Sequence, residues 1–262
     1  MGRPRSGSPN RPLPPPLPPG QRTVGQLVAE AVRLYGRRFW PALLVGIGPA
    51  ALGLLASRVD RTTALVVSAT AGALVLALAF VLATRIATGV TGAPWATAVV
   101  AGTIVFAPFA LLVQALVFPG VLWLALVGLA VPAIVVERLG LVAGFRRGLE
   151  LARADFVHAL GGFAALWLVV FLTQTVLAFV LRGQADQTLQ TAVLLASVVV
   201  SPVFFLGGAL LHADQAARVV DSGSRKPRKG RRDAALHPAL DADGAGGADA
   251  EVEPRAAARG EP

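Results

Sequence analysis

Two histidines and two aspartates are the side chains in this sequence best suited to form a chemical site. Asp155 lies three positions before His158, and His212 lies two positions before Asp214. If the two pairs meet in space, they supply imidazole and carboxylate groups for a metal ion or for proton transfer. The simpler alternative is that water solvates each side chain separately. We favour the second interpretation and keep the first as the alternative.

Other catalytic and cofactor patterns are missing from the sequence. The chain has no cysteine, which excludes disulfides, thiol catalysis and cysteine-bound metals. It has neither a GxxxxGK[ST] loop nor a strand followed by GxGxxG and an acidic residue, which are the common nucleotide-binding patterns. We therefore expect no cofactor, no resident metal and no enzymatic activity.

Six long apolar segments must position these side chains. Of the 262 residues, 55% are hydrophobic, and the mean hydropathy is +0.64. A helix needs about 20 apolar residues to cross a hydrocarbon layer of about 30 Å. The segments of this length are 39–57, 64–83, 96–116, 119–136, 158–181 and 189–211. We predict an all-α integral membrane protein with six transmembrane helices.

The boundary between the third and fourth segments is the least marked. No charged residue occurs from Trp95 to Val136, a stretch about twice as long as one span requires. Phe118, Pro119 and Gly120 lie near its middle, and proline with glycine interrupts helices. We expect the turn at these three residues.

The basic residues sort to one side of the six spans. Of 24 Lys and Arg residues, only Arg58, Arg61 and Arg182 fall in the loops of the opposite side. The positive-inside rule then places both termini in the cytoplasm. Arginine and alanine are abundant whereas lysine occurs only at Lys226 and Lys229, a bias associated with GC-rich bacterial genomes. The predicted location is the bacterial inner (plasma) membrane.

Two shorter segments are predicted to form amphipathic helices at the cytoplasmic surface. Residues 23–26, Thr-Val-Gly-Gln, fit a capping box, so a helix should begin there. The second segment lies in the longest cytoplasmic loop, where Leu139, Val142, Phe145 and Leu149 recur at helical spacing. Helices of this kind suit the membrane interface.

Basic side chains near these helices and in the C-terminal tail are candidates to contact anionic lipid headgroups. They are Arg37, Arg38, Arg146, Arg147, Arg153, Arg225, Lys226, Arg228, Lys229, Arg231 and Arg232. The net charge of +9 alone would also suit nucleic acid, but its distribution by membrane side favours lipids. We expect membrane lipids as partners, leave an unidentified membrane protein partner open, and expect no nucleic acid.

The two ends of the chain have the composition of disordered segments. Residues 1–22 contain the proline-rich stretch Leu-Pro-Pro-Pro-Leu-Pro-Pro-Gly, which favours an extended polyproline conformation. Residues 219–262 are basic, of low complexity and poor in large apolar residues. We predict that both are disordered and that the membrane domain comprises residues 23–218.

Three blocks of sequence resemble the family named for the membrane domain of glycerophosphoryl diester phosphodiesterase. They are residues 24–44, VGQLVAEAVRLYGRRFWPALL, residues 132–156, PAIVVERLGLVAGFRRGLELARADF, and residues 201–218, SPVFFLGGALLHADQAAR. The resemblance implies a helical membrane domain that acts on or near lipids. It does not imply phosphodiesterase activity, because the family's hydrolase is a separate TIM barrel, a fold of about 250 residues.

The function predicted from these features is a noncatalytic membrane module that organises lipids or partner proteins at the cytoplasmic face. The alternative is a transporter or channel for a neutral or amphipathic solute. It rests on prolines within four spans, at positions 49, 108, 132 and 202, which can kink helices around a cavity. The repeat of Ala69, Ala73 and Ala77 predicts close helix packing and no activity.

Overall fold

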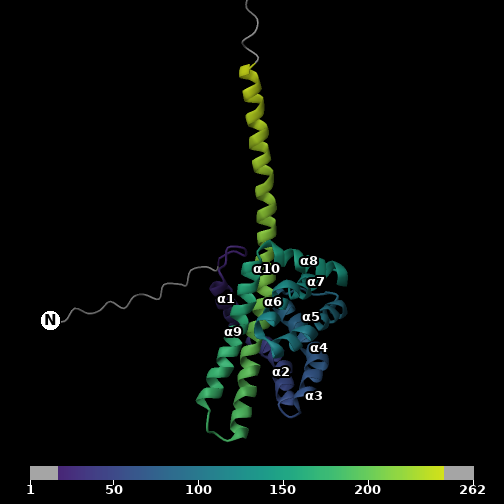
Figure 1. Cartoon of the computed structure of the whole chain (residues 1–262), viewed down its shortest axis with the longest axis vertical. Helices are drawn as coiled ribbons and strands as arrows, with labels where there is room; N and C mark the ends of the chain where they lie inside the picture. Colours follow the sequence, from purple (N-terminus) through teal and green to yellow (C-terminus); the bar gives the residue numbers. More distant parts are fainter. Residues whose placement is uncertain (1–16, 245–262) are drawn as a thin grey trace, which may run out of the picture. The chain divides into compact units, whose positions relative to one another are not determined.

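The computed structural model describes residues 17–244, except for the side chains of Asp186 and residues 222–244. The chain divides into two units, Met1–Val219 and Val220–Pro262. Within the described range, six helices are long and apolar enough to cross a membrane, which confirms the prediction of a multi-pass membrane protein. Figure 1 shows these helices and their labels.

Two of the six spans are interrupted, so eight named helices and one π-helical turn build them. They are α2 (Phe39–Ala56); α3 (Arg61–Val67), the turn η1 (Ser68–Gly72) and α4 (Ala73–Thr88); α5 (Trp95–Ala115); α6 (Val117–Val127) and α7 (Ala130–Glu137); α9 (Phe156–Val180); and α10 (Asp186–Gly244). Two further helices are α1 (Val24–Arg37) and α8 (Leu141–Ala154), which match the segments predicted to be amphipathic.

Helix α1 begins where its capping box predicts. The amide of Thr23 donates to Oε1 of Gln26 at 2.8 Å, and the amide of Gln26 donates to the hydroxyl of Thr23 at 3.4 Å. The buried carboxylate of Glu30 accepts hydrogen bonds from Arg33 and Arg37, each at 3.0 Å. The two hydrogen bonds of the capping box satisfy amides that every helix start leaves free.

The turn between the third and fourth spans was predicted at the wrong residues. The break lies at Leu116, which has extended backbone angles (φ −151°, ψ 131°), and α6 begins at Val117. Pro119 therefore lies in the first turn of α6. A proline is tolerated there because amides in the first turn have no partner within the helix.

Small residues bring neighbouring spans together. Ala73 and Ala77 of the predicted small-residue face are fully buried. A Cβ atom added to Gly102 of α5 would lie 2.6 Å from the Cβ of Ala77, which shows how closely α4 and α5 approach. Without water to drive association, helices in a bilayer gain stability from such close contact.

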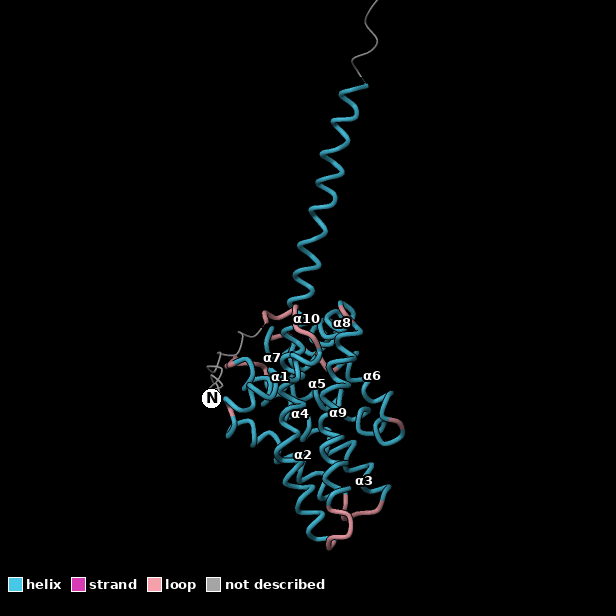
Figure 2. The backbone as a smooth tube through the Cα atoms, turned by 90° about the vertical axis from the view of Figure 1, so that its left-hand side faces the viewer, coloured by secondary structure: helices cyan, strands magenta, loops and turns pink. Residues whose placement is uncertain are grey.

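Several turns of the first unit lie at its two ends. Figures 1 and 2 both show the α2–α3 and α9–α10 turns at one end and α8 at the opposite end. At the first end, Arg58 donates to Oε1 of Gln190 at 3.1 Å. At the other, Arg138 donates to the carbonyl of Thr91 at 3.1 Å. Of the three arginines predicted for the minority side, Arg58 and Arg182 lie in the α2–α3 and α9–α10 turns, and Arg61 is the first residue of α3.

The C-terminal tail differs from its prediction. Composition predicted disorder from residue 219, but helix α10 continues to Gly244. Extending an existing helix requires no new nucleus, and arginine, lysine and alanine favour helix. Most of the predicted disordered N-terminal segment, residues 1–16, and the last residues, 245–262, lie outside the described range.

Candidate functional site

Asp155 links the start of α9 to the far end of the membrane-spanning part of α10. It separates α8 from α9, and its backbone (φ −150°, ψ 81°) breaks the helix. Its Oδ1 accepts the backbone amide of His158 at 3.0 Å, which caps α9. Its Oδ2 accepts a hydrogen bond from Nη1 of Arg218 at 2.7 Å. Both carboxylate oxygens of Asp155 are therefore engaged.

Asp214 forms the buried half of a second ion pair. Its side chain is fully buried, and its Oδ1 lies 3.1 Å from Nη1 of Arg22. Its Oδ2 lies 4.0 Å from Nε2 of His158, beyond hydrogen-bonding distance. Within the described residues neither of these two atoms has a hydrogen-bond partner.

Arg218 and Gln215 complete the group. Arg218 Nη2 donates to the carbonyl of Arg22 at 3.0 Å and lies 3.4 Å from Nδ1 of His158. Gln215 Nε2 donates to the carbonyl of Asp155 at 2.9 Å. We call this group the α9–α10 polar cluster; it consists of Arg22, Asp155, His158, Asp214, Gln215 and Arg218.

His212, predicted to join the same cluster, belongs to a different one. Its Nε2 lies 3.4 Å from Oε1 of Glu137, at the end of α7. Arg147 of α8 pairs with Glu137 at 3.0 Å and with Glu150 at 3.1 Å. Burial alone would lower the pKa of Arg147, but hydrogen bonds to the two glutamates raise it above its ordinary value. His212 points to α7 because it lies two residues before Asp214, on another side of α10.

The predicted metal or proton site is therefore only partly assembled. The structure brings Asp155, His158 and Asp214 together but pairs both carboxylates with arginines. In the part of the chain that can be described, no group of three or more His, Cys, Asp or Glu residues could hold a metal ion. The ion pairs of the cluster connect α10 to two other segments, the one before α1 and the start of α9. This arrangement suits a role in stabilising the fold.

The sequence patterns did not predict four members of these clusters: Arg22, Gln215, Arg218 and Glu137. One signal was available: Asp214 and Arg218 are four positions apart, a spacing that places them on one side of a helix. Their partners on other segments carry no such signal.

The arginines predicted to contact lipid divide into two groups. Arg37 is paired with Glu30, and Arg147 with its two glutamates. Arg38, Arg146 and Arg153 are exposed and form no ion pair with any residue the structure describes. The six basic candidates of the tail, Arg225 to Arg232, lie where side chains are not described.

Exposed apolar side chains accompany the three unpaired arginines. Val142, Arg146 and Arg153 are four and seven positions apart and so share one face of α8. Val142 is 81% exposed, and Trp40, two residues after Arg38, is 75% exposed. Tryptophan and arginine side chains are typical of the layer between lipid headgroups and hydrocarbon.

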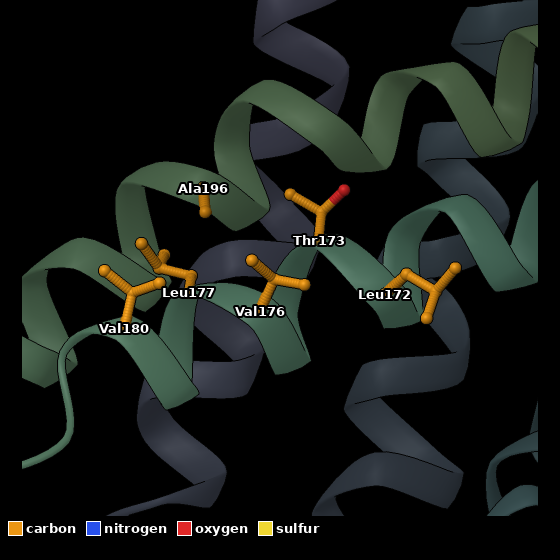
Figure 3. A pocket seen from close by; sticks show the side chains of 6 residues that line it. All are labelled: Leu172, Thr173, Val176, Leu177, Val180 and Ala196. Atoms are coloured by element: carbon orange, nitrogen blue, oxygen red, sulfur yellow. The ribbon is translucent and has the colours of Figure 1, made fainter.

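An apolar groove lies between α9 and α10, toward the α9–α10 turn. This open groove has a volume of about 490 Å³ and is lined by Leu172, Thr173, Val176, Leu177, Val180 and Ala196, as Figure 3 shows. The hydroxyl of Thr173 donates to the carbonyl of Val169 at 2.8 Å, so it is already satisfied. A second hollow of about 270 Å³ lies between α2 and α10, beside Ala50 and Ser197. The atoms that line the groove between α9 and α10 are almost all carbon.

Comparison with known proteins assigns neither a family nor a function to this chain. No family model matches the chain, and no curated protein and no solved structure is detectably similar to it. The resemblance of the three sequence blocks therefore stays a prediction.

Proposed function

We propose that this protein is a noncatalytic membrane module that binds lipids with anionic headgroups and organises them at the cytoplasmic face. The observation that carries the proposal is the exposure of Arg38, Arg146 and Arg153 without a carboxylate partner among the described residues. The cytoplasmic placement rests on the positive-inside rule, since α1 and α8 belong to the side with most basic residues.

The attraction between these arginines and lipid headgroups depends on where the charges lie. A basic residue close to an anionic membrane surface contributes about 1 kcal/mol of attraction. An arginine already paired with a glutamate adds little, which is why Arg37 and Arg147 are weaker candidates. Val142 and Trp40 would place apolar groups at the level of the acyl chains beside the arginines.

The lining of the hollows favours lipid over a hydrated solute. The groove on α9 and α10 and the hollow between α2 and α10 present mainly aliphatic side chains. A polar solute would lose its hydration there without gaining hydrogen bonds. Measuring the flux of neutral and amphipathic solutes in proteoliposomes tests the alternative of transport.

The test of the proposed function compares two double variants. Arg146→Gln with Arg153→Gln removes two unpaired charges from α8, whereas Arg61→Gln with Arg182→Gln removes two exposed charges from the opposite end. We expect native mass spectrometry to show at least a threefold loss of retained anionic lipid in the α8 variant only, and the difference should shrink at high salt. Equal lipid retention in both variants would contradict the proposal.

A further inference from the structure

An aromatic cavity lies near the middle of the spans. It has a volume of about 200 Å³, is open on one side, and receives side chains from α2, α4, α5, α9 and α10. The residues that matter for its chemistry are Phe106, Phe109, Trp167, Val170, Ser201 and Phe205. Trp167 stands near the centre of α9 (Phe156–Val180), and no charged residue occurs within that helix.

Carbon atoms line most of the cavity. Phe106 and Phe205 are 1% and 3% exposed and form its floor, with ring centroids 6.2 Å apart at an angle of 68°. The hydroxyl of Ser201 donates to the carbonyl of Ser197 at 2.6 Å, so it needs no partner from a ligand. Apolar cavities of about 150 Å³ exclude water and can accept an apolar ligand.

The cavity reaches the outer surface of the helices. Phe109, Trp167 and Val170 line it and remain partly exposed. At this depth in a bilayer the surrounding medium is hydrocarbon. An empty cavity would forgo the dispersion contacts that a chain segment makes with its walls. The available molecule that matches both the lining and the depth is therefore an acyl chain.

We infer that this cavity is a binding site for part of a lipid acyl chain. The inference deepens the proposed function, on which it rests, because it gives the organised lipid a site for its chain as well as one for its headgroup. A chain held between five helices would exchange more slowly than the lipids of the surrounding layer.

Trp167 reports on the occupant directly. A protein with Trp40→Phe, Trp95→Phe and Trp123→Phe keeps Trp167 as its single tryptophan. It is reconstituted in phosphatidylcholine whose acyl chains carry bromine at mid-chain, because bromine quenches tryptophan fluorescence on contact. Val170→Phe fills the cavity, and Val169→Phe makes the same change at the neighbouring position outside its lining.

We expect Val170→Phe to reduce the quenching of Trp167 at least twofold relative to Val169→Phe. Equal quenching in the two variants would overturn the inference, because it would mean that bromine reaches Trp167 only from the lipid surface. If Val170→Phe does not fold, Val113→Phe fills the cavity from α5, with Val100→Phe as its control.

The lipid in this experiment carries no net charge, which separates the two proposals. Suppose that Val170→Phe reduces the quenching as expected but the α8 variant retains as much anionic lipid as its control. That result would contradict only the proposed headgroup binding. Lost anionic preference in the α8 variant together with equal quenching in the cavity variants would contradict only the chain site.

Discussion

The guanidinium of Arg218 lies 2.7 Å from the carboxylate of Asp155, although 63 positions separate the two residues along the chain. The same arginine donates to the carbonyl of Arg22, 196 positions away. One side chain of α10 therefore holds both the start of α9 and the segment that precedes α1. The first two predictions concern the ion pairs by which α10 holds these segments, Arg218 with Asp155 and Asp214 with Arg22.

Substitutions at Asp155 should separate its role as a helix cap from its role in the ion pair. Asparagine can still cap α9 but cannot pair with Arg218, whereas alanine does neither. We expect Asp155→Ala to lower the free energy of unfolding by about 1 kcal/mol more than Asp155→Asn does. Unfolding in mixed detergent, followed by circular dichroism, measures both. Equal losses would show that the cap contributes nothing.

The contributions of Asp214 and Arg22 to the free energy of unfolding should depend on each other. Breaking a buried ion pair by removing one partner costs about 3–5 kcal/mol, because it leaves a buried charge without compensation. We expect Asp214→Leu and Arg22→Met to destabilise the protein singly by about that amount, and the double variant to lose less than the sum of the two. Additive losses in the unfolding free energy would show that the pair is not coupled.

The ionisation of Asp60, at the opposite end of the first unit, should depend on its hydrogen bonds to Thr63. Hydrogen bonds from the backbone amide and side chain of Thr63 lower the pKa of Asp60 below its ordinary value of 3.8. A carboxylate with a lowered pKa stabilises the fold while it is ionised, so its contribution is complete above that value and is lost as the pH falls through its pKa in the folded protein. Carbon-detected NMR of the Asp60 carboxyl group should show a midpoint below 3.8, and Thr63→Val should raise it. An unchanged midpoint in the variant would contradict this.

Gly148 should be required for the contact between α7 and α8. A Cβ atom at Gly148 would lie 2.5 Å from the backbone nitrogen of Ala130 and 2.7 Å from its Cα, so α8 would have to move. We expect Gly148→Ala to destabilise the protein by about 1–3 kcal/mol. Gly36→Ala is the control: it lies in α1 with nothing within 4 Å of the added atom, and it should stabilise by about 0.5–1 kcal/mol. Thermal unfolding in detergent compares the two, and equal effects would contradict the packing argument.

Local patterns allowed much of the fold to be predicted. The six apolar segments correspond to the six candidate spans, since the length and hydropathy of a segment are sufficient to identify it. The capping box at Thr23 and Gln26 fixed the start of α1 because both hydrogen bonds lie within four residues. The break at Leu116 was misplaced by two residues, because proline is tolerated in the first turn of a helix as well as in a turn.

The candidate site could be predicted only in part. The sequence by itself determined that Asp155, His158, His212 and Asp214 lie at ends of spans on the same side, because hydropathy and charge place them there. Only the tertiary structure decided that Arg22 pairs with Asp214 and that His212 faces Glu137. Helical spacing determines which residues share a side of one helix, but which neighbour meets that side depends on how all the helices pack together.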